Sequence, residues 1–379
     1  MIVGAGVFGA AAARTLAARG AAVTVVEPGP VPHVDAASTD ISKAIRMDYG
    51  ADAFYAAQME AALDGWAAWN AAWGERLFHD DGVTFLARTP LATGGFEFES
   101  ARVIEARGHR IERLDAAALA ERFPAWAATR YPDGYFNPRG GWAASGAVVA
   151  RLWSEALARG VTHRAGRCVG LVEEAGRVTG ARLADGSSVH GDAVVVAAGA
   201  WTAALLPQLA EVMWATAQPV LHFRPADPTP FRSPRFVTWG ADIARTGWYG
   251  FPANDEGIVK VAHHGSGERV DPSAPREPPW AEEGRFRAFL RDALPGLADA
   301  PLVGARRCLY SDTFDGDFWI DRDPDRPGLV VAAGGSGHAF KFAPLLGNWA
   351  ADAVDGRPVE RFRWRGRGPD ATEAARFDG

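Results

Sequence analysis

The strongest constraint on the fold is a glycine pattern at the start of the chain. MIVGAGVFG places Gly4, Gly6 and Gly9 between a short apolar strand and an alanine-rich segment with helical composition. In a strand–turn–helix unit, these glycines allow a tight turn, close backbone approach to a pyrophosphate, and close packing of helix on strand. The helix N-terminus then faces the phosphates with its positive dipole end. Glu27 closes the next strand at the spacing needed to bind an adenosine ribose, so the segment predicts a dinucleotide site.

Two later segments favour FAD over NAD. Residues 167–202 have the pattern of a three-stranded meander, a buried strand and a turn at Gly199. Residues 327–354 again have the pattern of strand, glycine-rich turn and helix. The glycines of that turn are Gly334, Gly335 and Gly337. A first βαβ unit whose sheet is completed far downstream is the layout of large flavoproteins.

The remaining segments are expected to form a second domain. Between residues 214 and 302, aromatic and β-branched runs alternate with Pro, Gly and Asp turns, which is typical of an antiparallel sheet. The predicted fold class is α/β with an α+β second domain: a Rossmann-like FAD-binding domain beside a substrate-binding domain built on a mixed antiparallel sheet. The predicted boundaries are 1–79, 139–213 and 303–379 for the FAD-binding domain, and 80–138 and 214–302 for the substrate-binding domain. We expect the tail after residue 360 to be held loosely.

Composition narrows the possible partners. A net charge of −6 provides no polybasic surface for nucleic acid or anionic membranes. The longest apolar run, near residue 195, is too short to span a bilayer. Two distant cysteines form neither a disulfide framework nor a metal site, which fits a reducing cytoplasm. We therefore expect a cytoplasmic monomer or homodimer without a metal ion. Trp66, Trp69 and Trp73 recur at helical spacing and are expected in the core.

Lysine is scarce in this chain. Of its 40 basic residues only Lys43, Lys260 and Lys341 are lysines, and the other 37 are arginines. An ammonium is a compact charge whose pKa shifts readily on burial, which a guanidinium cannot do. Codon bias is the plain alternative, but the pattern suggests that lysine is kept where the chemistry requires it.

Five motifs, in this order, resemble the sarcosine oxidase-like branch of the D-amino-acid-oxidase superfamily, over nearly the full length. They are GAGVFG, DISKAIRMDYG, WYGFP followed by GIVKVAHH, CLYSDTFDGDFWID, and AAGGSGHAFKFAPLLG. That branch includes sarcosine, N-methyltryptophan, pipecolate and fructosyl-amino-acid oxidases. The resemblance implies an FAD-dependent amine oxidase.

The resemblance implies a role for Cys308, which matches the family cysteine that carries the flavin through its 8α-methyl group. Thiolate is the attacking species, and on a strand Arg306, Cys308 and Tyr310 share one face, so we expect Arg306 to favour the thiolate. The alternative is a free cysteine that packs as a small hydrophobe. Cys168 has no such context and is interpreted as core.

The resemblance also implies that Lys260 lies near flavin N5 and assists the reaction with oxygen. A fixed cation in a poorly solvated pocket stabilises the negative charge that develops on oxygen. The alternative is a surface lysine on an edge strand. His264, on the same strand face, matches an active-site histidine, whereas His263 should point away.

For the substrate side, relatives use the residues matching Arg46 and Lys341 to hold the substrate carboxylate. A guanidinium fork suits bidentate binding, and an ammonium adds a point charge. The alternatives are a salt bridge from Arg46 to Asp48 and a flavin contact for Lys341. We place Arg46 in a loop-to-helix segment after Glu27.

Three further residues complete the predicted site. Tyr249 and Tyr310 match tyrosines that line the family pocket. Lys43, where sarcosine oxidases have arginine, is typical of fructosyl-amino-acid oxidases, so a bulkier substrate is plausible.

The predicted function is therefore oxidation of the C–N bond of a secondary amine or N-substituted amino acid. The imine product would hydrolyse, and oxygen would be reduced to hydrogen peroxide. The partners are the small-molecule amine and oxygen, with no nucleic acid and no membrane. Two alternatives stay open: a dehydrogenase that uses another electron acceptor, and an FAD-binding subunit of a larger complex without turnover alone.

Overall fold

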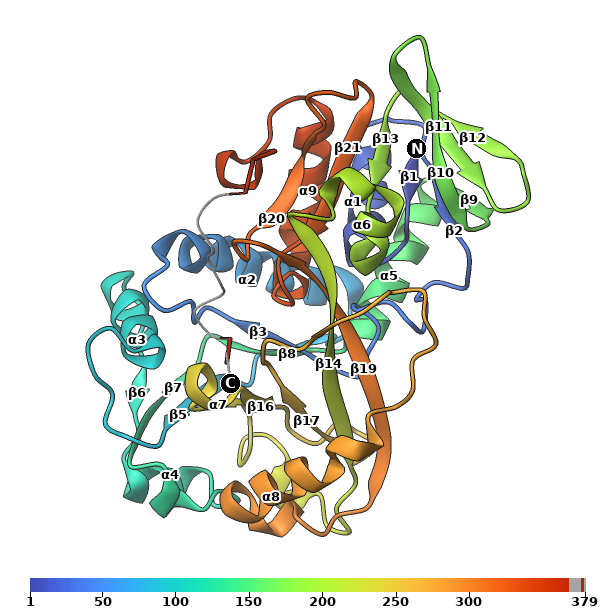
Figure 1. Cartoon of the computed structure of the whole chain (residues 1–379). Helices are drawn as coiled ribbons and strands as arrows, with labels where there is room; N and C mark the ends of the chain where they lie inside the picture. Colours follow the sequence, from blue (N-terminus) through green and yellow to red (C-terminus); the bar gives the residue numbers. More distant parts are fainter. Residues whose placement is uncertain (368–375, 378–379) are drawn as a thin grey trace.

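The computed structural model describes residues 1–367 and 376–377 (Figure 1). Its first sheet is six-stranded, in the order β20-β21-β13-β1-β2-β9. All neighbours in it are parallel except β20, which is antiparallel to β21. The strands are β1 (Ile2–Val3), β2 (Thr24–Glu27), β9 (Thr162–Ala165), β13 (Val194–Val196), β20 (Phe318–Arg322) and β21 (Leu329–Gly334). The parallel order confirms the Rossmann-like sheet expected from the glycine turn.

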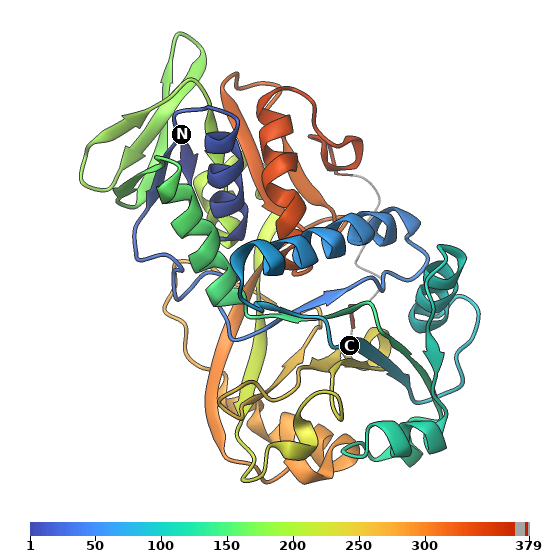
Figure 2. The same ribbon diagram turned by 180° about the vertical axis from the view of Figure 1, so that it is seen from behind.

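Strand alternation gives this sheet two apolar faces. Ile2, Val195 and Val330 belong to the core formed with helices on one face, which stand in front of the sheet in Figure 2. These helices are α1 (Val7–Ala18), α2 (Ala53–Trp73), α5 (Ser145–Ala158) and α9 (Ala343–Val354). Val196 and Val331 belong to a second core, with α6 (Thr202–Leu205) and the predicted three-stranded meander. The meander comprises β10 (Cys168–Glu174), β11 (Arg177–Leu183) and β12 (Ser188–His190), so that prediction is confirmed.

A second, nine-stranded sheet is mainly antiparallel, with one parallel pair between β5 and β15. Its longest strands pair with each other along their whole length: β14 (Met213–Phe223) and β19 (Leu302–Thr313). The others are β5 (Val83–Ala87), β6 (Glu112–Arg113), β7 (Asp133–Asn137), β15 (Thr238–Ala241), β16 (Trp248–Gly250), β17 (Val259–His263) and β18 (Glu268–Arg269). The nearby helices are α3 (Phe96–Ala106), α4 (Ala116–Arg122), α7 (Ile243–Thr246) and α8 (Glu283–Ala293). Strands from segments 80–138 and 214–302 thus share one sheet, which also contains β19, while the domain boundaries stay a prediction.

A small sheet lies beneath α2, in the order β3-β8-β4 (Figure 2). Its strands are β3 (Lys43–Arg46), β4 (Phe78–His79) and β8 (Gly140–Ala143). The prediction of a loop-to-helix segment around Arg46 is therefore wrong. β3 pairs antiparallel with β8, almost a hundred positions away, and this long-range pairing decides the conformation over the weak local pattern.

The described part of the tail does not fit the expectation of loose attachment. Arg361 lies 2.7 Å from Asp52 and 2.8 Å from Asp317, and Arg365 lies 2.5 Å from Asp315. Elsewhere, Trp66 and Trp73 are buried and Trp69 packs against the same core, as expected. None of the helices within the described ranges is long and apolar enough to cross a membrane. Among the described residues there is also no group of side chains that could hold a metal ion.

Candidate active site

The turn between β1 and α1 is built for close approach. Gly4 has φ 98°, and a Cβ at this position would lie 2.5 Å from the Ala197 carbonyl oxygen, so no larger residue fits. The side chain of Glu27, at the end of β2, accepts a hydrogen bond of 2.8 Å from the Ala5 amide. Gly6 caps α1, whose first turn contains no acidic residue. The turn therefore joins a tight backbone surface to a helix N-terminus, which suits a phosphate.

The other predicted cofactor-binding glycines lie at the same edge of the sheet. Gly199 follows β13, and Gly334, Gly335 and Gly337 end or follow β21. Ligands of open α/β sheets bind at the carboxyl ends of the strands, which is where these turns meet. Gly337 also approaches a pocket residue: a Cβ there would lie 2.4 Å from the Tyr310 ring.

One pocket gathers most of the predicted catalytic and substrate-binding residues. Its lining includes seven predicted residues: Lys43, Arg46, Tyr249, His264, Tyr310, Gly337 and Lys341. They come from β3, β16, the end of β17, β19, the glycine turn and the short helix before α9. Segments almost 300 positions apart therefore bring three cations and two tyrosines to one cavity. We refer to it as the cation pocket.

Cys308 lies buried on β19 beside this pocket. The Lys43 ammonium contacts its Sγ at 3.5 Å. The Arg306 guanidinium donates to backbone carbonyls of Ala36 and Thr39, so its influence on the thiolate stays a prediction. The Lys43 ammonium is the cation that contacts the thiol directly. Cys168 is half-buried and packs against the core near the meander, and burial raises its pKa.

Lys260 is buried next to the cation pocket. Its ammonium lies 2.7 Å from the Asp40 carboxylate, 2.6 Å from the Ser42 carbonyl oxygen, and 4.7 Å from the ring of Phe251, a pocket residue. Burial lowers the pKa of Lys260 to about 8, although the Asp40 charge acts in the opposite direction. Burial would raise the pKa of Asp40, but the charge of Lys260 and a hydrogen bond from His222 hold it well below its usual range.

The alternative of a surface lysine is wrong, because β17 lies between β14 and β16 in the sheet interior. Sequence reasoning missed Asp40. It precedes Lys43 by three positions, but its partner is 220 residues away, and a charge pattern along the chain does not show such a pair.

Arg46 and Lys341 line the cation pocket and lie among aromatic rings. The Arg46 guanidinium lies over the rings of Tyr49, Phe85 and Phe96, at 5.3, 5.8 and 5.7 Å. The Lys341 ammonium donates a 3.0 Å hydrogen bond to the Tyr49 hydroxyl. Stacking of this kind holds a guanidinium in place without neutralising its charge.

A polar network supports these two cations. The Tyr49 hydroxyl lies 2.9 Å from Nδ1 of His338, whose Nε2 lies 3.0 Å from the Gly316 carbonyl oxygen. Asp48 accepts a 2.6 Å hydrogen bond from the Tyr135 hydroxyl, and burial raises its pKa. Sequence reasoning missed Tyr49 and His338, although both lie within the motifs that carry Arg46 and Lys341.

The tyrosines and histidines follow the expected strand faces. The Tyr249 and Tyr310 hydroxyls lie 3.3 Å apart, and burial raises the pKa of Tyr310 well above its usual range. The His264 ring lies 5.6 Å from the Tyr310 ring. His263 points away, as predicted, and packs against Trp248 at 4.9 Å.

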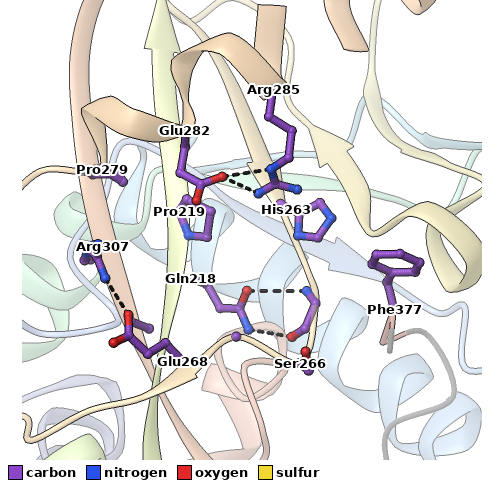
Figure 3. A pocket seen from close by; sticks show the side chains of 13 residues that line it. Gln218, Pro219, His263, Ser266, Glu268, Pro279, Glu282, Arg285, Arg307 and Phe377 are labelled. Carbon is purple, nitrogen blue, oxygen red and sulfur yellow. Dashed lines mark hydrogen bonds and ion pairs between the residues drawn. The ribbon is translucent and has the colours of Figure 1, made fainter. Parts of the chain in front are cut away.

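A second cavity, drawn in Figure 3, lies on the face to which His263 points. Its charged groups already pair with each other: Arg285 lies 2.7 Å from Glu282, and Arg307 lies 3.0 Å from Glu268. Both ends of the Gln218 amide bond the backbone of Gly265 (Figure 3). None of the predicted site residues lines it, so the cation pocket is the candidate active site.

Comparison with known proteins agrees with this geometry. The family model for DAO, FAD dependent oxidoreductase, matches residues 1–353. The chain is 30% identical over 368 residues to an N-methyl-L-tryptophan oxidase of Salmonella heidelberg, with 94% of each chain covered. It is 28% identical over 361 residues to a monomeric sarcosine oxidase of a Bacillus species, covering 93% of this chain and 91% of the relative. The structure of Amadoriase I, a fructosyl amine:oxygen oxidoreductase from Aspergillus fumigatus, matches with a TM-score of 0.83 at 27% identity, covering 96% of this chain and 88% of that one.

Proposed function

This chain belongs to the DAO family of FAD dependent oxidoreductases, and we propose that it oxidises the C–N bond of a secondary amine or N-substituted amino acid with oxygen as the acceptor. The imine product hydrolyses in water, and oxygen is reduced to hydrogen peroxide by the two electrons taken from the amine. The observation that carries this proposal is a single pocket lined by two aromatic-bound cations and a tyrosine pair, next to a buried ammonium.

The residues present fit FAD. The Gly4 to Gly9 turn offers the pyrophosphate a surface that any Cβ at Gly4 would block, together with a helix N-terminus. Glu27, at the end of β2, offers a carboxylate to the ribose. FAD, when bound, takes two electrons from the amine and passes them to oxygen.

Cys308 is the proposed point of covalent attachment, through its Sγ and the 8α carbon of FAD. Forming this thioether releases two protons and two electrons, which oxygen accepts to give hydrogen peroxide. The thiolate is the nucleophilic form, and a neighbouring cation favours it. The Lys43 ammonium, 3.5 Å from Sγ, is the cation in a position to do so.

Arg46 and Lys341 are proposed to bind the substrate carboxylate. A guanidinium held against three rings keeps its fork in one orientation, so little entropy is lost when a carboxylate binds. The Tyr49 hydroxyl bonds the Lys341 ammonium and thereby fixes its position. These contacts would hold the substrate carboxylate in one orientation in the cation pocket.

Tyr249, Tyr310 and His264 are proposed to surround the reacting amine. Because burial raises the pKa of Tyr310, its hydroxyl keeps its proton and can donate or accept a hydrogen bond. The Tyr249 hydroxyl lies 3.3 Å from the Tyr310 hydroxyl and gives the pocket a second polar group beside it.

Lys260 is the proposed promoter of the oxygen reaction. Electron transfer to oxygen creates negative charge, and a fixed ammonium in a poorly solvated site stabilises it more strongly than water-exposed lysine would. The alternative of a dehydrogenase would not need this buried cation, and nothing else in the pocket favours it.

The substrate class can be tested with a peroxide-coupled screen of the flavin-loaded chain. The candidates are sarcosine, larger N-methyl amino acids, cyclic amino acids and fructosyl amino acids. We expect peroxide from at least one of them. Anaerobic bleaching of the flavin without peroxide production in air would instead establish a dehydrogenase.

The isolated chain is proposed to turn over alone, as a cytoplasmic monomer or homodimer. Both cysteines are free, which suits a reducing compartment. Gel filtration combined with the peroxide assay tests this: activity confined to fractions with a different polypeptide would contradict it.

A further inference from the structure

Two residues at the C-terminal end of the described chain contact the cation pocket from outside. Arg376 forms a bidentate ion pair with Asp312, with distances of 2.7 and 2.9 Å. The same guanidinium donates a 3.0 Å hydrogen bond to the Ser336 carbonyl oxygen. The tail thus reaches β19 and the glycine turn after β21 with one side chain.

Phe377 binds a third segment through its backbone. Its amide donates to the His264 carbonyl oxygen at 3.1 Å, and its carbonyl oxygen accepts from the Ser266 amide at 2.9 Å. Its ring lies 5.7 Å from the His263 ring, at the edge of the second cavity (Figure 3). These bonds attach the tail to the backbone directly after β17.

Each of the three contacted segments supplies a residue to the cation pocket. His264 itself lines the pocket and accepts the bond from Phe377. Tyr310 precedes Asp312 by two positions on β19, and the Arg376 guanidinium lies 5.8 Å from its ring. Ser336 precedes the pocket residue Gly337 and has φ 41°, a conformation that needs support from its surroundings.

The ion pair at the centre of this arrangement is almost free of solvent. The side chains of Arg376 and Asp312 are 9% and 2% exposed. Removing one partner of such a pair leaves an uncompensated buried charge, which is strongly destabilising locally. Asp312 therefore needs Arg376 as the partner of its buried charge, and this pair joins the tail to the end of β19 next to the pocket.

We propose that Arg376 and Phe377 position His264 and Tyr310 for substrate binding, with Asp312 as the anchor. The effect on catalysis rests on the proposed function of the cation pocket, whereas the docking of the tail does not. Arg376 and Asp312 are positioning residues, because they act through the pocket residues and not on the substrate.

The test compares Arg376→Ala, Arg376→Lys and a chain ending at residue 375 with Arg365→Ala. Arg365 is a matched control: it also forms a bidentate pair with an aspartate, Asp315, but contacts no pocket residue. We measure acetate binding through the flavin absorbance, anaerobic flavin reduction, and hydrogen exchange at the Ser266 amide. Arg376→Ala and the shortened chain should weaken acetate binding and slow reduction at least 10-fold. Arg376→Lys keeps the charge but only one of the two bonds, so it should show a smaller effect.

The two proposals fail in distinguishable ways. Ser266 amide exchange should become at least 10-fold faster in Arg376→Ala and stay unchanged in Arg365→Ala, whatever the substrate is. Unchanged exchange, or faster exchange with normal acetate binding and reduction, would overturn the positioning role. Wild-type protein that binds no acetate and is reduced by no amine would overturn the proposed function, while the exchange experiment still decides whether the tail is docked.

Discussion

The Lys260 ammonium and the Asp40 carboxylate form an ion pair of 2.7 Å in which both side chains are 1% exposed. The electrostatic potentials of two opposite charges at this distance largely cancel far from the pair. They do not cancel at a small molecule that lies next to the ammonium. The carboxylate also keeps the lysine protonated in a site where burial alone would neutralise it. Asp40 therefore helps to set the pH up to which Lys260 stays protonated.

Replacing Lys260 with methionine should separate the two half-reactions. Reoxidation of reduced flavin by oxygen should slow by two orders of magnitude or more, because the charge that stabilises the developing anion is lost; removal of one such preorganised group typically costs about 10²- to 10³-fold. Anaerobic reduction by the amine should change much less. Stopped-flow absorbance measures both steps.

The control for this variant removes both charges. Lys260→Met alone leaves Asp40 buried without its partner, which destabilises the fold by about 3–5 kcal/mol. The double variant Lys260→Met with Asp40→Asn restores neutrality. Equal losses in both half-reactions, in the single and the double variant, would show that Lys260 has no special part in the oxygen step.

The oxygen step should also depend on pH. Lys260 has a pKa of about 8, so the ammonium is present below this pH and is lost as the pH rises through it. The reoxidation rate should fall over the same interval. Asp40→Asn removes the negative charge, while the charge of Lys43 still disfavours the protonated form of Lys260. The fall in the reoxidation rate should therefore occur at a lower pH in this variant.

A buried aspartate far from the pocket provides the control for this pH experiment. Asp323 is 5% exposed and accepts a hydrogen bond from the Asp325 amide, so Asp323→Asn tests the loss of a buried carboxylate as such. Its pH profile should match the wild type. An identical profile for Asp40→Asn would mean that another group causes the pH dependence.

Cys308→Ala should release the flavin. After denaturation in acid, the yellow colour should stay with the wild-type precipitate and pass into the supernatant for the variant. Cys168→Ala is the matched control, because it removes the other free cysteine and should keep the colour bound. Colour that stays with Cys308→Ala would place the bond on another residue.

Lys43→Met should bind flavin but form the covalent bond more slowly, since the cation 3.5 Å from Sγ is lost.

Local patterns predicted the parts of the molecule that depend on short-range chemistry. The Gly4 turn, the meander and the strand faces of His263 and His264 follow from glycine geometry and from alternation with a period of two. Pairings between distant segments could not be predicted in this way. Asp40 meets Lys260, and Lys43 meets Cys308, only because the segment that leads into β3 lies against β17 and β19 of the nine-stranded sheet. The scarcity of lysine nevertheless drew attention to three residues that lie in or beside the cation pocket.

The same limit explains Arg306 and Arg376. Alternation places Arg306 and Cys308 on one face, but it does not reveal the loop whose carbonyls bind the Arg306 guanidinium. Arg376 lies in a tail whose composition predicts loose attachment, and one buried aspartate, Asp312, overrides that composition. The amino-acid composition of a segment does not show whether one of its residues forms a buried ion pair with a distant segment.

Arg46→Lys should be a severe change in spite of the conserved charge. The guanidinium stacks on Tyr49, Phe85 and Phe96, whereas an ammonium can neither stack as a plane nor bind a carboxylate with two parallel bonds. Loss of one charged hydrogen bond costs about 1.5–3 kcal/mol, so acetate should bind roughly 10- to 150-fold more weakly. Arg139→Lys, at a partly exposed arginine outside the pocket that pairs with Asp64, is the control and should bind acetate normally. Equal affinities for both variants would remove Arg46 from the carboxylate site.

Glu97 should make the stability of the fold depend on pH in an unusual direction. It lies in the first turn of α3, is 5% exposed, and has its pKa raised to about 7 from 4.5, mainly by burial and further by the charge of Asp242. A raised carboxyl pKa means that the folded state binds more protons than the unfolded state between these two pH values. The free energy of unfolding therefore falls as the pH rises from 4.5 to 7, by up to about 3 kcal/mol at 1.36 kcal/mol per pKa unit.

Glu97→Gln removes this penalty, because the amide has the same shape and stays neutral. Relative to wild type, the variant should gain stability between pH 4.5 and 8, by up to about 3 kcal/mol, in denaturant unfolding measured at both pH values. Glu99→Gln, on the same helix, should not produce this gain, since the pKa of Glu99 is lowered by hydrogen bonds from the Gly94 amide and from Arg102. An equal gain in the free energy of unfolding in both variants would mean that the loss of a negative charge, and not the burial of Glu97, stabilises α3. This helix packs against the pocket residue Ile243.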